Sequence, residues 1–120
     1  MKELSIIIPR ERLSDVNSIL YKHKVGGVVY FEIGGRGRAE RKEIEHRTVE
    51  GYSTGKRYVP EFHSRTMVQV VVPDSLENTV ISEIMEKTST GSAGDGKIFV
   101  KEITGAYDIG SKQSGDQAAL

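Results

Sequence analysis

Two amphipathic helical patterns, each placed between β-forming runs, constrain the fold of this chain more than any other feature. In both helical patterns, apolar residues recur at three- and four-residue spacing, whereas the flanking runs are short and rich in β-branched residues. The expected strands are 4–9, 28–33, 66–72 and 98–103, and the expected helices are 13–23 and 76–85. The order β-α-β-β-α-β predicts an α+β, ferredoxin-like domain with both helices on one face of an antiparallel sheet.

The run Thr66–Val72 (TMVQVVV) is apolar on both sides of the strand, with only Gln69 intervening. A strand with one solvated face should alternate between apolar and polar residues. Two helices can cover only one face of the sheet, and large apolar patches are rarely left open. The chain is therefore expected to form an obligate homo-oligomer.

Residues 34–64 separate the second and third expected strands and carry few apolar residues, several glycines and both signs of charge. Stretches of this length without periodicity are usually functional or disordered. We interpret the segment as a mobile loop projecting from a hairpin, with Tyr52 and Tyr58 displayed as possible sites of modification or partner contact. The domain is expected to span residues 1–105. Residues 106–120 are expected to be a polar tail, disordered over its last ten positions.

Composition excludes several classes of protein. The 120 residues include 17 Lys and Arg and 17 Asp and Glu, so binding of nucleic acid by bulk positive charge is not expected. Cysteine is absent, which removes disulfides, thiolate nucleophiles and zinc–thiolate sites. No signal peptide or membrane-spanning run is recognisable, so a cytoplasmic location is expected.

A glycine-rich loop at residues 90–97 is the sharpest motif. It fits the phosphate-loop pattern G-x-x-x-x-G-K from Gly91 to Lys97, but Ile98 stands where a magnesium-binding Ser or Thr would follow. The loop also leads from a helix to a strand, the reverse of a true P-loop. Its amides and lysine could bind an anion, or the loop could be a flexible turn with an incidental lysine.

A second glycine-rich stretch, residues 34–38, places Arg36 and Arg38 on a flexible frame. The paired arginines suit phosphate or carboxylate binding, although a hinge with solvated arginines would have the same sequence. The grouping of Glu43, Glu45 and His46 has no spacing that determines a metal geometry, so no metal site is predicted.

The sequence does not favour enzymes that have the same strand order. A nucleoside diphosphate kinase needs a histidine near the phosphates, and no histidine lies near the glycine loop. An acylphosphatase needs an arginine in an early loop, and Arg10 and Arg12 lack the surrounding pattern. An RNA-recognition module stacks bases on aromatic side chains of its central strands, whereas the aromatic residues here are scattered.

The chain resembles the PII family of signal-transduction proteins over residues 3 to about 104. Residues 90–91 and 94–100 match the family's B-loop, residues 35–38 match the entry to its T-loop, and residues 70–74 match the strand that leaves it. The resemblance implies a homotrimer with T-loop about 36–64 and B-loop 90–97, whose T-loop docks onto a membrane transporter or a metabolic enzyme. It also implies adenine nucleotide binding between subunits, at Gly27, Val28, Val29, Arg38, Arg65, Val71, Gly94, Asp95, Gly96 and Lys97.

The departures from the family pattern bear on the ligand. Ala39 replaces a glutamine that helps bind magnesium and 2-oxoglutarate, so the resemblance implies that 2-oxoglutarate sensing is weakened or absent. Arg65 replaces a lysine and could still hold a carboxylate. Asp108 and Gly110 stand where the family has two phosphate-contacting arginines. ATP (with Mg²⁺), ADP, AMP and cyclic AMP all remain candidate ligands, and a PII-like trimer that binds proteins without any small ligand is the alternative.

Overall fold

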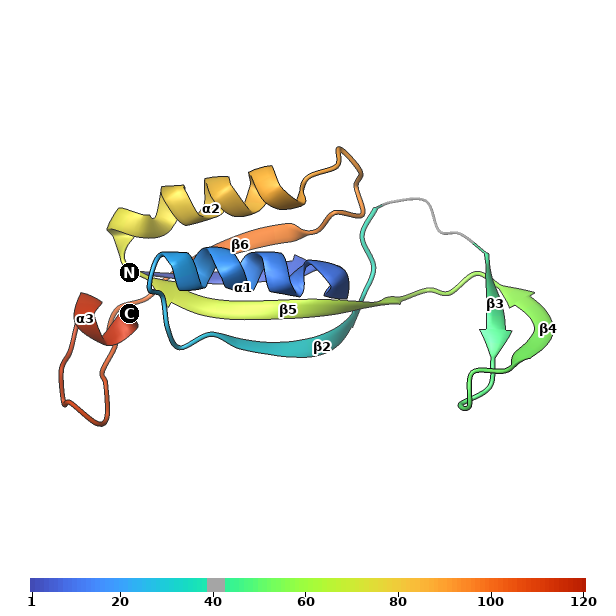
Figure 1. The fold of residues 1–120 in the computed structure, drawn as a ribbon, viewed down its shortest axis with the longest axis horizontal. Coiled ribbons are helices and arrows are strands. Elements are labelled where there is room, and N and C mark those ends of the chain that lie inside the picture. Colours follow the sequence, from blue (N-terminus) through green and yellow to red (C-terminus); the bar gives the residue numbers. More distant parts are fainter. Residues whose placement is uncertain (39–42) are drawn as a thin grey trace.

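The computed structural model describes residues 1–38 and 43–120, and it has the expected succession of strands and helices (Figure 1). A four-stranded antiparallel sheet has the order β2-β5-β1-β6. This order agrees with a ferredoxin-like fold. The elements of the domain are β1 (Lys2–Ile8), a 3₁₀ turn (Arg10–Arg12), α1 (Leu13–Lys22), β2 (Val29–Gly35), β5 (His63–Val72), α2 (Asp74–Thr88) and β6 (Lys97–Glu102).

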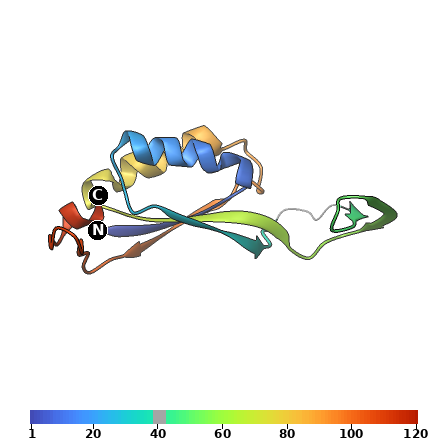
Figure 2. The ribbon, with the colours of Figure 1, turned by 60° about the horizontal axis from the view of Figure 1, so that its bottom comes forward.

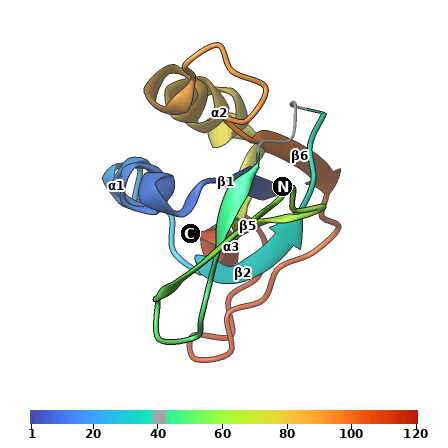
Figure 3. The same ribbon diagram turned by 90° about the vertical axis from the view of Figure 1, so that its right-hand side faces the viewer.

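Both helices cover the same face of the sheet, as the turned view and the end-on view show (Figures 2 and 3). Alternate residues of β1 and β5 point into this layer, and the register places Leu4 opposite Val70 and Ile6 opposite Val68. The helices contribute side chains at three- and four-residue spacing, which is why the sequence pattern predicts them. The fully buried apolar side chains of this core include Leu4, Ile6, Val16, Leu20, Val68, Val72, Val80 and Ile84.

None of the helices in the described residues covers the opposite face of the sheet (Figure 2). Phe31 of β2 and Phe99 of β6 lie on it with 43% and 56% of their surfaces exposed. Met67 and Val71 of β5 also lie on this face and are only half-buried in the single chain. The apolar pattern marks a face that a single chain cannot cover. The predicted oligomer stays a prediction.

The long connection, residues 36–62, contains a hairpin that the sequence pattern did not predict. Strands β3 (Ile44–Arg47) and β4 (Ser53–Tyr58) pair antiparallel and project beyond the end of the main sheet (Figure 1). Gly51, at φ +91°, allows the tight turn between them. Both faces of the hairpin are solvated, so its sequence has no alternation of apolar and polar residues that would predict it. Cross-strand polar contacts replace a core, for example Arg57 Nε to Glu43 Oε1 at 2.8 Å.

The predicted disorder of residues 111–120 is wrong. The tail turns back at the Tyr107–Ser114 bridge and ends in the short helix α3 (Asp116–Ala119), where Ala119 is buried. Asp108 organises the turn, because its carboxylate accepts hydrogen bonds from the amide and the hydroxyl of Ser111 at 2.8 and 2.7 Å. These hydrogen bonds lower the pKa of Asp108. None of the described helices has the length and apolar character needed to cross a membrane.

Candidate functional site

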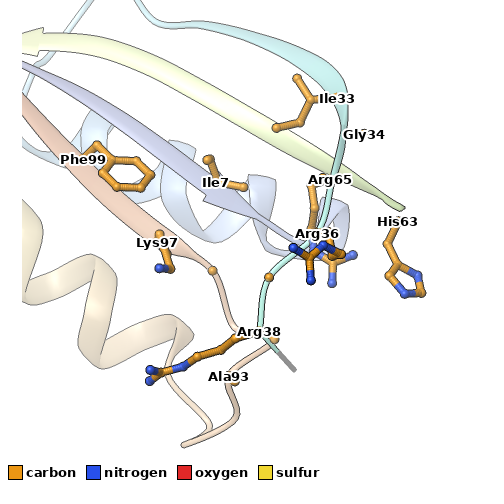
Figure 4. Close-up of a pocket in the computed structure, with 14 residues that line it drawn as sticks. Ile7, Ile33, Gly34, Arg36, Arg38, His63, Arg65, Ala93, Lys97 and Phe99 are labelled. Atoms are coloured by element: carbon orange, nitrogen blue, oxygen red, sulfur yellow. The ribbon is translucent and has the colours of Figure 1, made fainter. Parts of the chain in front are cut away.

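A pocket of about 570 Å³ opens where the sheet meets the long connection and the glycine loop (Figure 4). Its apolar floor comes from the uncovered face of the sheet, through Ile7, Ile33 and Phe99. Its rim is glycine-rich and cationic. The rim residues are Gly34, Gly35, Arg36, Gly37, Arg38, His63, Arg65, Ala93, Gly94, Gly96 and Lys97.

The pocket brings together half of the nucleotide-binding residues predicted from the resemblance. Arg38, Arg65 and Lys97 line it together with Gly94 and Gly96, although they come from three separate parts of the chain. Arg65 lies in β5, Arg38 follows β2, and Lys97 begins β6. Antiparallel pairing places the end of β2 beside the start of β5, so the fold gathers these cations at one end of the sheet.

Four of the other predicted residues lie at the opposite end of the sheet, whereas Asp95 lies in the glycine loop. Gly27, Val28 and Val29 are at the start of β2, and Val71 is near the end of β5. Val71 lies six residue steps along β5 from Arg65, which corresponds to about 20 Å. Within one chain the two groups therefore do not form one site. Ala39, the position expected to weaken 2-oxoglutarate binding, lies outside the described residues.

The arginines of the chain divide sharply by location. Within the part of the chain that the structure describes, the arginines outside the pocket each form an ion pair with a carboxylate: Arg10 with Glu32, Arg12 with Asp15, Arg47 with Glu45, and Arg57 with Glu43. Arg36, Arg38 and Arg65 have no carboxylate partner among the described residues, and all three line the pocket. No described lining residue is acidic. A neutral chain thus concentrates positive charge in one pocket, which is typical of an anion-binding site.

The glycine loop is held in a defined shape by Asp95. Its carboxylate accepts hydrogen bonds from the Thr90 hydroxyl at 2.6 Å and from the Ser92 amide at 3.3 Å, and also from the Thr90 amide. These contacts lower the pKa of Asp95, the Thr90 hydroxyl having the largest effect. Asp95 does not line the cationic pocket; it borders a cavity on the helix side of the loop. The structure therefore gives Asp95 a role in shaping the loop, and the predicted phosphate contact stays untested.

Gly96 brings the loop into close contact with β1. Its φ is +123°, and a Cβ atom built there would lie 2.0 Å from the carbonyl oxygen of Ile7. Only glycine fits this position without movement of the backbone. The loop is consequently anchored next to the pocket floor, with Lys97 directly following it.

The two predicted modification sites are in the hairpin, away from the pocket. Tyr52 is 72% exposed, whereas Tyr58 is 45% exposed and contacts the ring of His46 edge-on. Glu43 and Glu45 are engaged by arginine, and His46 by Thr54. Across residues 1–38 and 43–120 no group of three or more acidic or histidine side chains is placed to hold a metal ion.

Comparison with known proteins identifies the family. The family model described as nitrogen regulatory protein P-II matches residues 1–113. The chain belongs to the nitrogen regulatory protein P-II family. It is 30% identical to nitrogen regulatory protein P-II 1 of Escherichia coli K12 over 98% of this chain and 99% of that protein. It is 32% identical to nitrogen regulatory protein P-II 2 of Methanothermobacter thermautotrophicus, over 98% and 96% of the two chains.

This P-II chain has two nitrogen-bearing lining side chains that were absent from the predicted site, Arg36 and His63. Arg36 follows β2 within the glycine-rich stretch, and its residue type already suggested anion binding. His63 lies opposite Gly35 and two residues before Arg65, so the two side chains share the uncovered face of β5. The sequence alone did not point to His63, because the strand was expected to begin at residue 66. In the structure β5 begins at His63, three residues earlier.

The hydrogen bonds of Asp95 predict how the P-II glycine loop responds to acid. Because the folded pKa is lowered, the loop should stay ordered at every pH above the ordinary carboxylate value of about 3.9, and loosen as the pH falls through the folded value. The NMR shifts of the Thr90 and Ser92 amides between pH 2 and 6 should therefore change only below about pH 3.9. The variant Asp95→Asn should lack this transition. A transition centred above pH 4 would contradict the assignment.

Proposed function

We propose that this chain is a P-II signal-transduction regulator of nitrogen metabolism that binds an adenine nucleotide and controls a target transporter or enzyme through its long connection. The observation that carries the proposal is the concentration, in the pocket beside the glycine loop, of arginines that have no carboxylate partner among residues 1–38 and 43–120. Guanidinium groups and loop amides together suit phosphate oxygens. The apolar floor offers contact area for the base or the ribose.

The split of the predicted residues supports a site shared between subunits. The phosphates would lie against Arg38, Lys97 and the glycine loop of one subunit, while Gly27–Val29 and Val71 of a neighbour would face the base. The uncovered apolar face of the sheet is a suitable surface for the homotrimer that this arrangement requires. We propose Mg²⁺ as a ligand only together with ATP.

The long connection is suited to transmit the state of the pocket. Arg36 and Arg38 stand where it leaves β2, and His63 and Arg65 stand where it enters β5. A phosphate bound among these residues would restrain both ends of the segment that carries the hairpin. Ligand-dependent ordering of such a segment is a common switching device.

Calorimetric titration of the full chain with ATP, ADP, AMP and cyclic AMP tests the proposal, with ATP repeated in the presence of Mg²⁺ and 2-oxoglutarate. We expect binding of at least one nucleotide and little further response to 2-oxoglutarate. In Lys97→Gln the affinity should fall about tenfold or more, because a charged hydrogen bond contributes ~1.5–3 kcal/mol.

Lys87→Gln is the control, since Lys87 is exposed in the last turn of α2, on the helical side of the sheet and outside the pocket. Equal losses in both lysine variants would point to general charge rather than a phosphate site. No heat with any nucleotide at millimolar concentration would contradict the proposal and favour a P-II trimer that binds only proteins.

A further inference from the structure

The basic side chains of the pocket form two groups rather than one (Figure 4). Lys97 and Arg38 lie beside the glycine loop, whose amides at Gly94 and Asp95 already donate hydrogen bonds to Ser92. Arg36, Arg65 and His63 lie at the other side, where the long connection meets β2 and β5. The two groups therefore face different parts of the pocket.

The second group is open to a ligand and has no acidic partner among the described residues. Arg65 is half-buried, and within the described part of the chain its Nη1 donates to the carbonyl oxygen of Ser64, at 2.9 Å. Arg36 stands between Gly35 and Gly37, where an added Cβ atom would meet nothing within 4 Å. Two guanidinium groups therefore border an open space, and each retains donors for an oxyanion.

We propose that Arg36 and Arg65, flanked by His63, form a second phosphate subsite that takes the terminal phosphate of a nucleoside polyphosphate whose inner phosphates lie on the glycine loop. The proposal rests on the function proposed above and specifies how the pocket selects its ligand. It makes the protein sensitive to the length of the phosphate chain. AMP would reach only the glycine-loop subsite, whereas ATP would reach both.

The subsite also changes what the sequence implies about ATP. Asp108 and Gly110 replace the cations expected in the tail, which predicts weak triphosphate binding. In the structure Asp108 is bonded to Ser111 and does not line the pocket of its own chain. Arg36 supplies positive charge from the base of the long connection, within the pocket itself. The chain can therefore hold a triphosphate without cations from the tail.

The test is calorimetric titration of the full chain and of Arg36→Gln with ATP, ADP and AMP. We expect ATP affinity to fall about tenfold or more in the variant, and AMP affinity to change less than twofold. Arg36→Lys should restore part of the ATP affinity, because it keeps the charge but lacks the planar fork. Arg57→Gln is the matched control, since Arg57 is exposed in the hairpin and paired with Glu43.

The outcomes separate this inference from the proposed function. If the wild-type chain binds no nucleotide, the proposed function fails and the subsite fails with it. If the wild-type chain binds nucleotides but Arg36→Gln weakens ATP and AMP equally, or neither, only the subsite is overturned. A further experiment titrates inorganic phosphate into the complex of the chain with AMP. If phosphate binds and its binding requires Arg36, while ATP affinity does not depend on Arg36, then the subsite takes a free anion. That result would show that the terminal-phosphate assignment is wrong.

Discussion

Replacing Gly96 with alanine is expected to destabilise the protein by about 3 kcal/mol or more and to abolish nucleotide binding. A Cβ atom there would lie 2.0 Å from the Ile7 carbonyl oxygen, and the φ of +123° is unfavourable for any other residue. Backbone strain of this kind costs ~1–3 kcal/mol, and the overlap costs a similar amount. Thermal unfolding followed by circular dichroism should show a midpoint lowered by about 10 °C.

Gly94→Ala is the matched control for this variant. A Cβ atom at Gly94 would meet only the Ser92 hydroxyl, at 3.5 Å, and its φ is not in the left-handed region. We expect a shift in the unfolding midpoint of less than about 3 °C. Equal destabilisation by the two substitutions would show that the close approach of Gly96 to β1 is not what anchors the loop.

Placing a charge on the uncovered face of the sheet is expected to dissociate the oligomer. Phe31 lies on this face, so Phe31→Glu would bury an unpaired carboxylate in the proposed subunit interface. Light scattering should report about 40 kDa, three times the chain mass of 13.3 kDa, for the wild-type protein and a single-chain mass for the variant. Nucleotide affinity should fall together with the mass, since the proposed site needs residues of two subunits.

The control for this experiment is Tyr21→Glu, because Tyr21 of α1 is 82% exposed on the helical side of the molecule. This variant should keep both the mass and the nucleotide affinity of the wild-type chain. A wild-type chain that weighs 13.3 kDa in solution would refute the trimer. A Phe31→Glu monomer that binds nucleotide normally would instead place the whole site within one subunit.

The strands and helices of the domain were predictable because each buries one face. Val16, Ile19 and Leu20 recur at helical spacing because they lie on the one face of α1 that is buried against the sheet. The long connection and the tail were not predictable by this route. Their order depends on turn hydrogen bonds and cross-strand ion pairs, such as those of Asp108 and Arg57, which produce no hydrophobic period.

The candidate site was predictable only in part. The glycine loop and the glycine-rich arginine stretch are local in sequence, so their residue types already indicate anion binding. The contributions of Arg65 and His63 depend on strand register, which places them beside Gly35 and Ile33. The separation of the expected nucleotide-binding residues into two groups could also not be predicted from the sequence. It is a distance along the sheet, which sequence separation does not give.

The sequence by itself determined the order of the main strands and helices, the location of the core, and the two glycine-rich loops that are candidates for anion binding, because these follow from local periodicity and residue type. Only the tertiary structure decided that the two loops share one pocket, that Asp95 shapes the glycine loop, and that the arginines left without described carboxylate partners are those lining this pocket. The physical reason is that charge pairing and cavity shape depend on contacts between residues far apart in the chain. Folding brings the ends of β2 and β5 beside the start of β6, and the positive charge of the pocket arises from that convergence.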